Sequence, residues 1–140
     1  MLFRSRFTHL RQVLSAGQSL QVCQPSPSSW GQGGYHNYWL NETNSWVVAE
    51  WQRASSAMVR RVNQGVGSAA QRDLLTQAGR ELLLAQSSDW SFILRAGTTT
   101  ELARERIHRH LDRFWRLLDA IDHGTPLPPA WLAEIGRAHV

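Results

Sequence analysis

Apolar side chains recur every three or four residues over a long stretch in the second half of this 140-residue chain. The spacing predicts a helix over residues 99–122, because positions three, four or seven apart share one face of an α-helix. Its expected buried face consists of Ala103, Ile107, Leu111, Phe114, Leu118 and Ile121. Similar apolar faces predict two further long helices, over about 46–64 and 68–86. Asn44 or Ser45 is placed to cap the first of them.

Two of these helices are preceded by the pattern of a capping box. In that pattern a serine or threonine is followed three residues later by glutamine or glutamate, and each side chain bonds a backbone N–H group. Ser68 with Gln71 matches it before the helix over 68–86, and Thr98 with Glu101 matches it before the helix over 99–122. We therefore expect both helices to begin at these residues.

The shorter elements are less regular. Apolar spacing predicts a helix over residues 3–16, and Pro128 or Pro129 is placed to begin a short last helix. Alternating residues in 19–23, SLQVC, suggest a strand. A lone strand either pairs with something outside the chain or does not form. The stretch 87–93, SSDWSFI, breaks the helical pattern.

The segment 24–41, QPSPSSWGQGGYHNYWLN, is suited neither to a helix nor to an idle linker, and we call it the aromatic loop. Its glycines, prolines and serines disfavour a helix. Its large aromatic residues disfavour disorder, which requires low hydrophobicity. These residues are Trp30, Tyr35, Tyr38 and Trp39. Loops of this length in compact domains are usually functional when they are ordered.

These patterns predict a mainly α fold. We expect a helical bundle of three long and two short helices with one long aromatic-rich loop. The length is that of a single domain, and a hydrophobic content of 42% is sufficient for a packed core. The chain also contains 7 tryptophans, a residue type that gathers in cores and binding surfaces.

Composition narrows the range of partners. All 15 basic residues are arginines, but the formal net charge is only +4 and no dense basic cluster with interleaved aromatic residues occurs. This disfavours nucleic-acid binding. No apolar run approaches the ~18 residues of a membrane span, and no signal-peptide pattern is present. We therefore expect no membrane partner and a cytoplasmic protein.

Candidate catalytic and metal-binding residues are sparse. Cleavage of a glycosidic bond needs two facing carboxylates, and the aromatic loop contains none, because the first acid in the chain is Glu42. Asp89 stands at a helix break, but one carboxylate does not make a pair. His108 and His110 lie two apart on a predicted helix and so point in different directions. We predict no catalytic residue, no metal site and no cofactor.

The aromatic loop is better suited to binding than to catalysis. Gly31, Gly33 and Gly34 permit tight bends and close approach of a ligand to the backbone. Trp30 and Trp39 offer flat apolar faces that suit the C–H-rich faces of sugar rings, while tyrosine, histidine and asparagine side chains can bond hydroxyls. The alternative is that both tryptophans pack inward and hold the loop down. The residue pattern alone leaves both interpretations open.

Three blocks of sequence carry a family resemblance. They are the aromatic loop, RELLLAQSSDWSFI at 80–93 and ERIHRHLDRFWRL at 105–117. In order and spacing they resemble the carboxy-terminal helical domain of glycoside hydrolase family 57 α-1,4-glucan branching enzymes, over about 7–131. The block SSWGxGG…WLN is the most specific part.

The resemblance implies a substrate and a site. Family members carry a distorted (β/α) barrel with a glutamate nucleophile and an aspartate acid/base. They cleave an α-1,4 glucan and re-attach the piece through an α-1,6 link. The helical domain packs against the barrel and supplies tryptophans to the substrate cleft, and the loop tryptophans match those positions. The predicted substrate-binding residues are Trp30, Trp39, Asp89, Trp90, Tyr35 and Gly33.

The barrel has no counterpart in this sequence, so we expect a chain that is not catalytic on its own. Residues 1–24 are then the remnant of a junction with the missing barrel, and 25–140 form the helical C-terminal domain. The expected partners are an α-glucan, such as amylose or glycogen, and a catalytic barrel in cis or in trans. The alternative is a helical protein–protein interaction module, suggested by the lone strand and the apolar residues over 3–13.

Overall fold

The computed structural model describes residues 7–137, and for residues 32, 136 and 137 it describes the backbone only. Within 7–137 the chain is helical and contains no β-strand. The elements are α1 (Leu10–Ser15), the short 3-10 helix η1 (Gln32–Gly34), α2 (Ser45–Asn63), α3 (Ala69–Ala85), α4 (Ser88–Ala96), α5 (Thr100–His123) and α6 (Pro129–Arg137). The predicted mainly α fold is confirmed.

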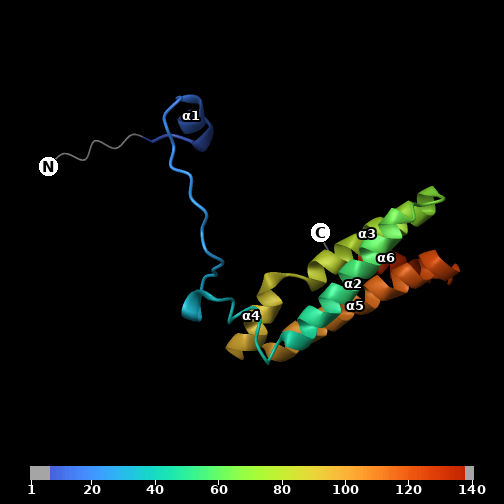
Figure 1. The fold of residues 1–140 in the computed structure, drawn as a ribbon. Coiled ribbons are helices and arrows are strands. Elements are labelled where there is room, and N and C mark those ends of the chain that lie inside the picture. The colour runs from blue at the N-terminus through green and yellow to red at the C-terminus, as the bar shows by residue number, and fades with distance from the viewer. Residues whose placement is uncertain (1–6, 138–140) are drawn as a thin grey trace.

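The long helices α2, α3 and α5 run side by side and form the bundle (Figure 1). The most extensive contact is between α3 and α5, and α4 packs against α5. The apolar faces predicted from the sequence meet in one core, in which Ile107, Phe114 and Leu117 are fully buried. Ile135 of α6 joins the same core and is also fully buried, so the last helix closes the bundle.

One polar network crosses the core. The carboxylate of Glu81 on α3 is fully buried and lies 2.6 Å from Nδ1 of His110 on α5. Gln77 donates from Nε2 to Glu81 at 2.8 Å and to the carbonyl of Ile135 at 3.4 Å. Arg113 lies 4.0 Å from Glu81. The network therefore joins α3, α5 and α6 through groups that satisfy one another, as buried polar groups must.

The N-terminal part differs from its prediction. The helix expected over 3–16 is the short α1, capped by His9, whose Nδ1 accepts from the N–H of Gln12 at 3.3 Å; residues 3–6 lie outside the described part. No residue of α1 is buried, and α1 lies apart from the bundle (Figure 1). Residues 19–23 are irregular and exposed, so the predicted strand is wrong. A single strand without a partner or a buried face has nothing to stabilise it.

The prediction for the stretch SSDWSFI, residues 87–93, is also corrected. Helix α3 ends at Ala85, but a new helix, α4, begins at Ser88 instead of a loop. It buries Ser91 and Leu94, ends at Ala96 and is followed by the C-cap Gly97, which has a φ of +77°. This short helix was hidden because nine residues give too few periods for a recognisable pattern. The described part of the chain thus has one more short helix than predicted.

The two capping boxes have different outcomes. The hydroxyl of Ser68 accepts from the N–H of Gln71 at 3.2 Å, and the amide of Gln71 accepts in turn from the N–H of Gly67 at 2.8 Å. The prediction of a capping box at Thr98 and Glu101 is wrong. The residue before α5 is Thr99, with a φ of +47° and no side-chain cap. Thr99, and not Thr98, therefore occupies the N-cap position of α5.

Candidate functional site

Four aromatic rings meet where the aromatic loop crosses α4. Trp30, Tyr38 and Trp39 come from the loop and Phe92 from α4, and we call this group the aromatic cluster. Tyr38 stacks on Phe92 with ring centroids 4.9 Å apart and an interplanar angle of 17°. Trp30 lies 6.1 Å from Trp39 in an edge-to-face arrangement and 6.0 Å from Phe92. Figure 1 shows the loop beside α4, at one end of the bundle.

The rings of the cluster differ in exposure. Trp30 is 72% exposed, whereas Tyr38, Trp39 and Phe92 are half-buried. The stack of Tyr38 on Phe92 therefore holds the loop to α4, while the ring of Trp30 remains open to solvent. A large exposed indole beside a second indole can take the apolar face of a ligand without a change of fold.

Asn44 joins the loop to α4. Its side chain is fully buried. The amide nitrogen donates to the carbonyls of Tyr38 and Ser91, both at 3.1 Å, and the amide oxygen accepts from the N–H of Asn41 at 2.9 Å. Asn44 occupies the N-cap position of α2 but its side chain makes no cap bond, contrary to the expectation for that residue. The sequence shows it as a cap because its distant partner, Ser91, is brought near only by the fold.

The loop backbone is closed by its own bonds. The N–H of Ser29 donates to the carbonyl of Gly34 at 2.7 Å, and the hydroxyl of Ser29 accepts from the N–H of His36 at 2.7 Å. Gly31 has a φ of +103°, and a Cβ at this position would lie 2.9 Å from the ring of Tyr38. Gly33, a predicted site residue, is exposed with a φ of +73°. These conformations are strained for any residue with a side chain.

The other predicted site residues do not join the cluster. The indole N–H of Trp90 donates to the carbonyl of Leu84 at 2.8 Å, across the break between α3 and α4. Its half-buried ring lines a separate hollow of about 450 Å³ with residues of α5. Asp89 is exposed and accepts from the hydroxyl of Ser87 at 3.4 Å. Tyr35 is 75% exposed and makes no ring contact with the cluster.

The described residues contain neither a cluster of metal ligands nor a membrane-spanning helix. Over 7–137, no three histidine, cysteine or acidic side chains come together as a metal site. In the same range, no helix has the length and apolar character needed to cross a membrane. The cluster consists of four aromatic rings, which can stack on the apolar face of a ligand.

Comparisons with known proteins agree with this fold. Residues 50–139 match the family described as "1,4-alpha-glucan branching enzyme, C-terminal". A 1,4-alpha-glucan branching enzyme of Thermococcus kodakarensis is 36% identical over 111 residues, which are 76% of this chain and 16% of that protein. The crystal structure of a GH57-type branching enzyme from Pyrococcus horikoshii aligns with a TM-score of 0.77 at 29% identity. This alignment covers 90% of our chain and 25% of the other.

The chain thus corresponds to a small part of the branching enzymes that it matches, 16% of the length of the curated relative. The family match covers most of α2 and all of α3, α4, α5 and α6, which contain most of the bundle core and Phe92. This chain belongs to the C-terminal family of 1,4-alpha-glucan branching enzymes.

Proposed function

We propose that this chain is the helical, glucan-contacting part of a 1,4-alpha-glucan branching enzyme, and that Trp30 and Trp39 form one side of its glucan-binding cleft. The observation that carries the proposal is the exposed indole of Trp30, held 6.1 Å from that of Trp39. Two adjoining indoles can stack on the C–H faces of neighbouring sugar units. Family membership supplies the class of ligand, an α-1,4 glucan.

The loop is held in its conformation before any ligand binds. Asn44, the stack of Tyr38 on Phe92 and the left-handed turn at Gly31 each restrict it. A site that is already ordered loses less conformational entropy on binding. The proposal therefore assigns Asn44 and Tyr38 the role of positioning residues for the tryptophan pair.

The proposal places bond cleavage and transfer on a catalytic barrel, joined in cis or in trans. Residues 1–24 then form the junction with it and 25–140 the helical domain. The support is the apolar surface of the described N-terminal part, where large side chains are left in solvent. They are Phe7, Leu10, Leu14, Leu20 and Val22. The same surface supports the second candidate function, a module that binds another protein and no sugar.

Kinetics on amylose test the tryptophan pair. With this chain combined with its catalytic barrel, Trp30→Ala and Trp39→Ala should each lower kcat/KM about tenfold, a loss of ~1.4 kcal/mol in transition-state binding. Leu83→Ala is the matched control, because Leu83 is equally exposed at 71% but lies on α3. Unchanged kinetics in both tryptophan variants would assign these rings to packing alone.

A second assay uses the chain alone. Purified chain incubated with amylose should form no α-1,6 linkages, measured by counting branches after enzymatic debranching. Branch formation by the chain alone would overturn the assignment of catalysis to the barrel. If the chain alone forms no branches and both tryptophan variants leave kcat/KM of the combined enzyme unchanged, the protein-binding module becomes the better account.

A further inference from the structure

A groove lies at the end of the bundle opposite the aromatic cluster. Three adjoining hollows of about 540, 460 and 320 Å³ make it up. The first and second share Arg61, Gln64 and Asp122, and the second and third share Trp115 and Asp119. The groove follows the last turns of α2 and α5, and Ser45 at the start of α2 lies ~18 Å along the helix from Ala57, the first groove residue, at ~1.5 Å per residue.

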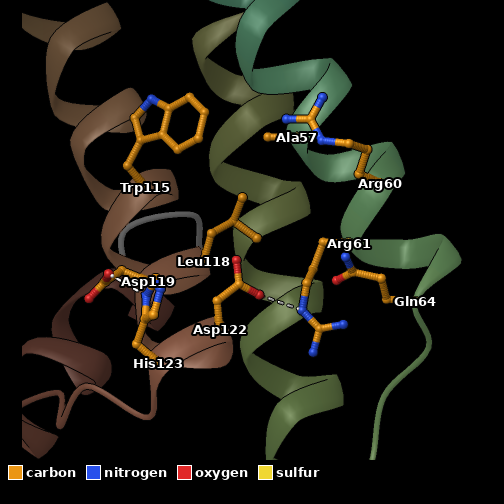
Figure 2. A pocket seen from close by; sticks show the side chains of 9 residues that line it. All are labelled: Ala57, Arg60, Arg61, Gln64, Trp115, Leu118, Asp119, Asp122 and His123. Carbon is orange, nitrogen blue, oxygen red and sulfur yellow. Dashed lines mark hydrogen bonds and ion pairs between the residues drawn. The ribbon is translucent and has the colours of Figure 1, made fainter.

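Opposite charges in the middle hollow balance. Two arginines, Arg60 and Arg61, and two aspartates, Asp119 and Asp122, line it, so their formal charges sum to zero with neutral histidine. Arg61 Nε lies 2.9 Å from Asp122 Oδ1 as an ion pair, although the N–H is not aligned for a hydrogen bond. Figure 2 shows this pair in the middle of the hollow. A balanced site disfavours phosphate or nucleic-acid ligands, which need excess positive charge.

The acceptors in the groove are held in place. Thr125 donates from its hydroxyl to Asp119 at 2.6 Å, and Nδ1 of His123 lies 2.9 Å from the other oxygen. The bond from Thr125, followed by that from His123, lowers the pKa of Asp119. Arg61 also donates to the carbonyl of Gly65 at 2.6 Å, which fixes the guanidinium against the turn after α2. Ionised, oriented carboxylates are strong acceptors for hydroxyl groups.

Other polar groups in the groove are not engaged. Among the described residues, the side chains of Arg60 and Gln64 take part in no hydrogen bond or ion pair, although both line the middle hollow. The half-buried ring of Trp115 lies at the edge of the hollow opposite Gln64, as Figure 2 shows, and the guanidinium of Arg53 covers one face of this ring at 4.2 Å from its centroid. The groove thus combines an indole edge, the unengaged donors of Arg60 and Gln64, and carboxylates that are held in place. This combination matches a neutral ligand that carries hydroxyl groups on an apolar ring.

We propose that this groove is a second binding site for an α-glucan chain, separate from the aromatic cluster. Its elongated form suits a linear oligomer, and its balanced mixture of donors and acceptors suits a neutral polyhydroxyl ligand. The inference rests on the proposed function for the identity of the sugar. A second site on the far end of the bundle would hold a long glucan near the enzyme while another segment occupies the cleft, as in bivalent binding.

Affinity electrophoresis of the full chain tests the groove. Native gels are run with and without glycogen, and the retardation of each variant is normalised to its own mobility without the polysaccharide. The groove variant is Arg60→Ala with Gln64→Ala. Its matched control is Gln52→Ala with Arg72→Ala, which removes an exposed amide and an exposed arginine outside the groove. A third variant, Trp30→Ala, reports on the aromatic cluster.

We expect the groove variant to lose retardation at least threefold relative to the wild type and its control. The groove variant should still lose retardation relative to the wild-type groove when both proteins also carry Trp30→Ala. Retardation that depends on Trp30 but not on the groove would overturn this inference and leave the proposed function intact. Retardation that depends on the groove but not on Trp30 would support the inference and count against the tryptophan pair. Absence of retardation in the wild type would overturn the groove site.

Discussion

The interior of the bundle and the aromatic loop are held in place by different means. In the interior, apolar faces such as that of Phe114 pack along whole helices, and the buried pair of Glu81 and His110 joins α3 to α5. The loop is fixed at single points, by Asn44 and by the stack of Tyr38 on Phe92. The stability of the fold and the geometry of the tryptophan pair therefore rest on separate residues. Changes in one region should leave the other largely intact.

The largest expected effect is in the core. Phe114→Ala removes a fully buried ring and leaves a cavity, so the free energy of unfolding should fall by ~3–5 kcal/mol. Urea unfolding followed by circular dichroism measures the change. A loss below ~1 kcal/mol would mean that the helices do not share one cooperative core.

The buried contact between Glu81 and His110 should give the next largest effect. Glu81→Ala leaves His110 and the amide of Gln77 without their carboxylate partner in the core, and we expect a loss of ~3 kcal/mol. The control is Glu105→Ala, which removes the exposed partner of Arg109 and should cost less than ~0.5 kcal/mol. The same urea experiment compares the two. Equal costs would show that the buried network contributes no more than a surface pair.

The link between loop and bundle gives a local effect. Asn44→Ala leaves two carbonyls and one N–H without their partner, at a cost of ~1–3 kcal/mol. Hydrogen exchange should speed up over residues 36–44 while amides in the middle of α3 and α5 keep their protection. Asn37→Ala, on the exposed part of the loop, is the control. Uniform acceleration along the chain would contradict the separation of the two regions.

The turn at Gly31 should show a smaller effect. Gly31→Ala introduces a Cβ at a φ of +103° and 2.9 Å from the ring of Tyr38, and we expect a loss of ~1–2 kcal/mol. Gly65→Ala is the matched control, since Gly65 has a φ of +76° but open space around it. A larger drop in melting temperature for Gly31→Ala than for Gly65→Ala would report the positive-φ, extended backbone of Gly31 together with its contact with Tyr38. Identical melting would show that the ring moves aside at no cost.

The smallest effect is at the surface. The hydrogen bond from Thr125 lowers the pKa of Asp119 below its ordinary value of 3.8. Because the folded pKa is depressed, the stabilisation is present above pH 3.8 and is lost as the pH falls through the folded value. Thr125→Val should raise this pKa back toward 3.8, as measured by NMR titration of the carboxyl carbon. An unchanged midpoint would show that Thr125 does not hold the carboxylate.

Much of the bundle could be predicted from the sequence, because amphipathic periods over 99–122 are a local signal that matches the observed α5. The contact between Glu81 and His110 could not be predicted. The two residues are 29 positions apart, and in the sequence each looks like an ordinary polar position on a helix. Helix α4 was too short for its period to show. Tertiary contacts, which local patterns do not encode, decided both.

The candidate site divides in the same way. The loop tryptophans were expected to act together, and the structure brings Trp30 beside Trp39. Phe92 was missed, although it lies in the same short block as Trp90, because neighbours on a helix point in different directions. Trp90 instead turns toward Leu84. Asn44 was missed as a link because asparagine before a helix usually serves as a cap.

The central claim is that Trp30 and Trp39 face a glucan, and titration of the chain with maltoheptaose tests it most directly. The indole N–H resonances of both residues should shift and saturate together with a dissociation constant of about a millimolar, since one side of a cleft buries little of the sugar. The indole N–H resonance of Trp90 should not shift. If the resonances of Trp30 and Trp39 do not move while the sugar is bound elsewhere on the chain, the account of this site is wrong.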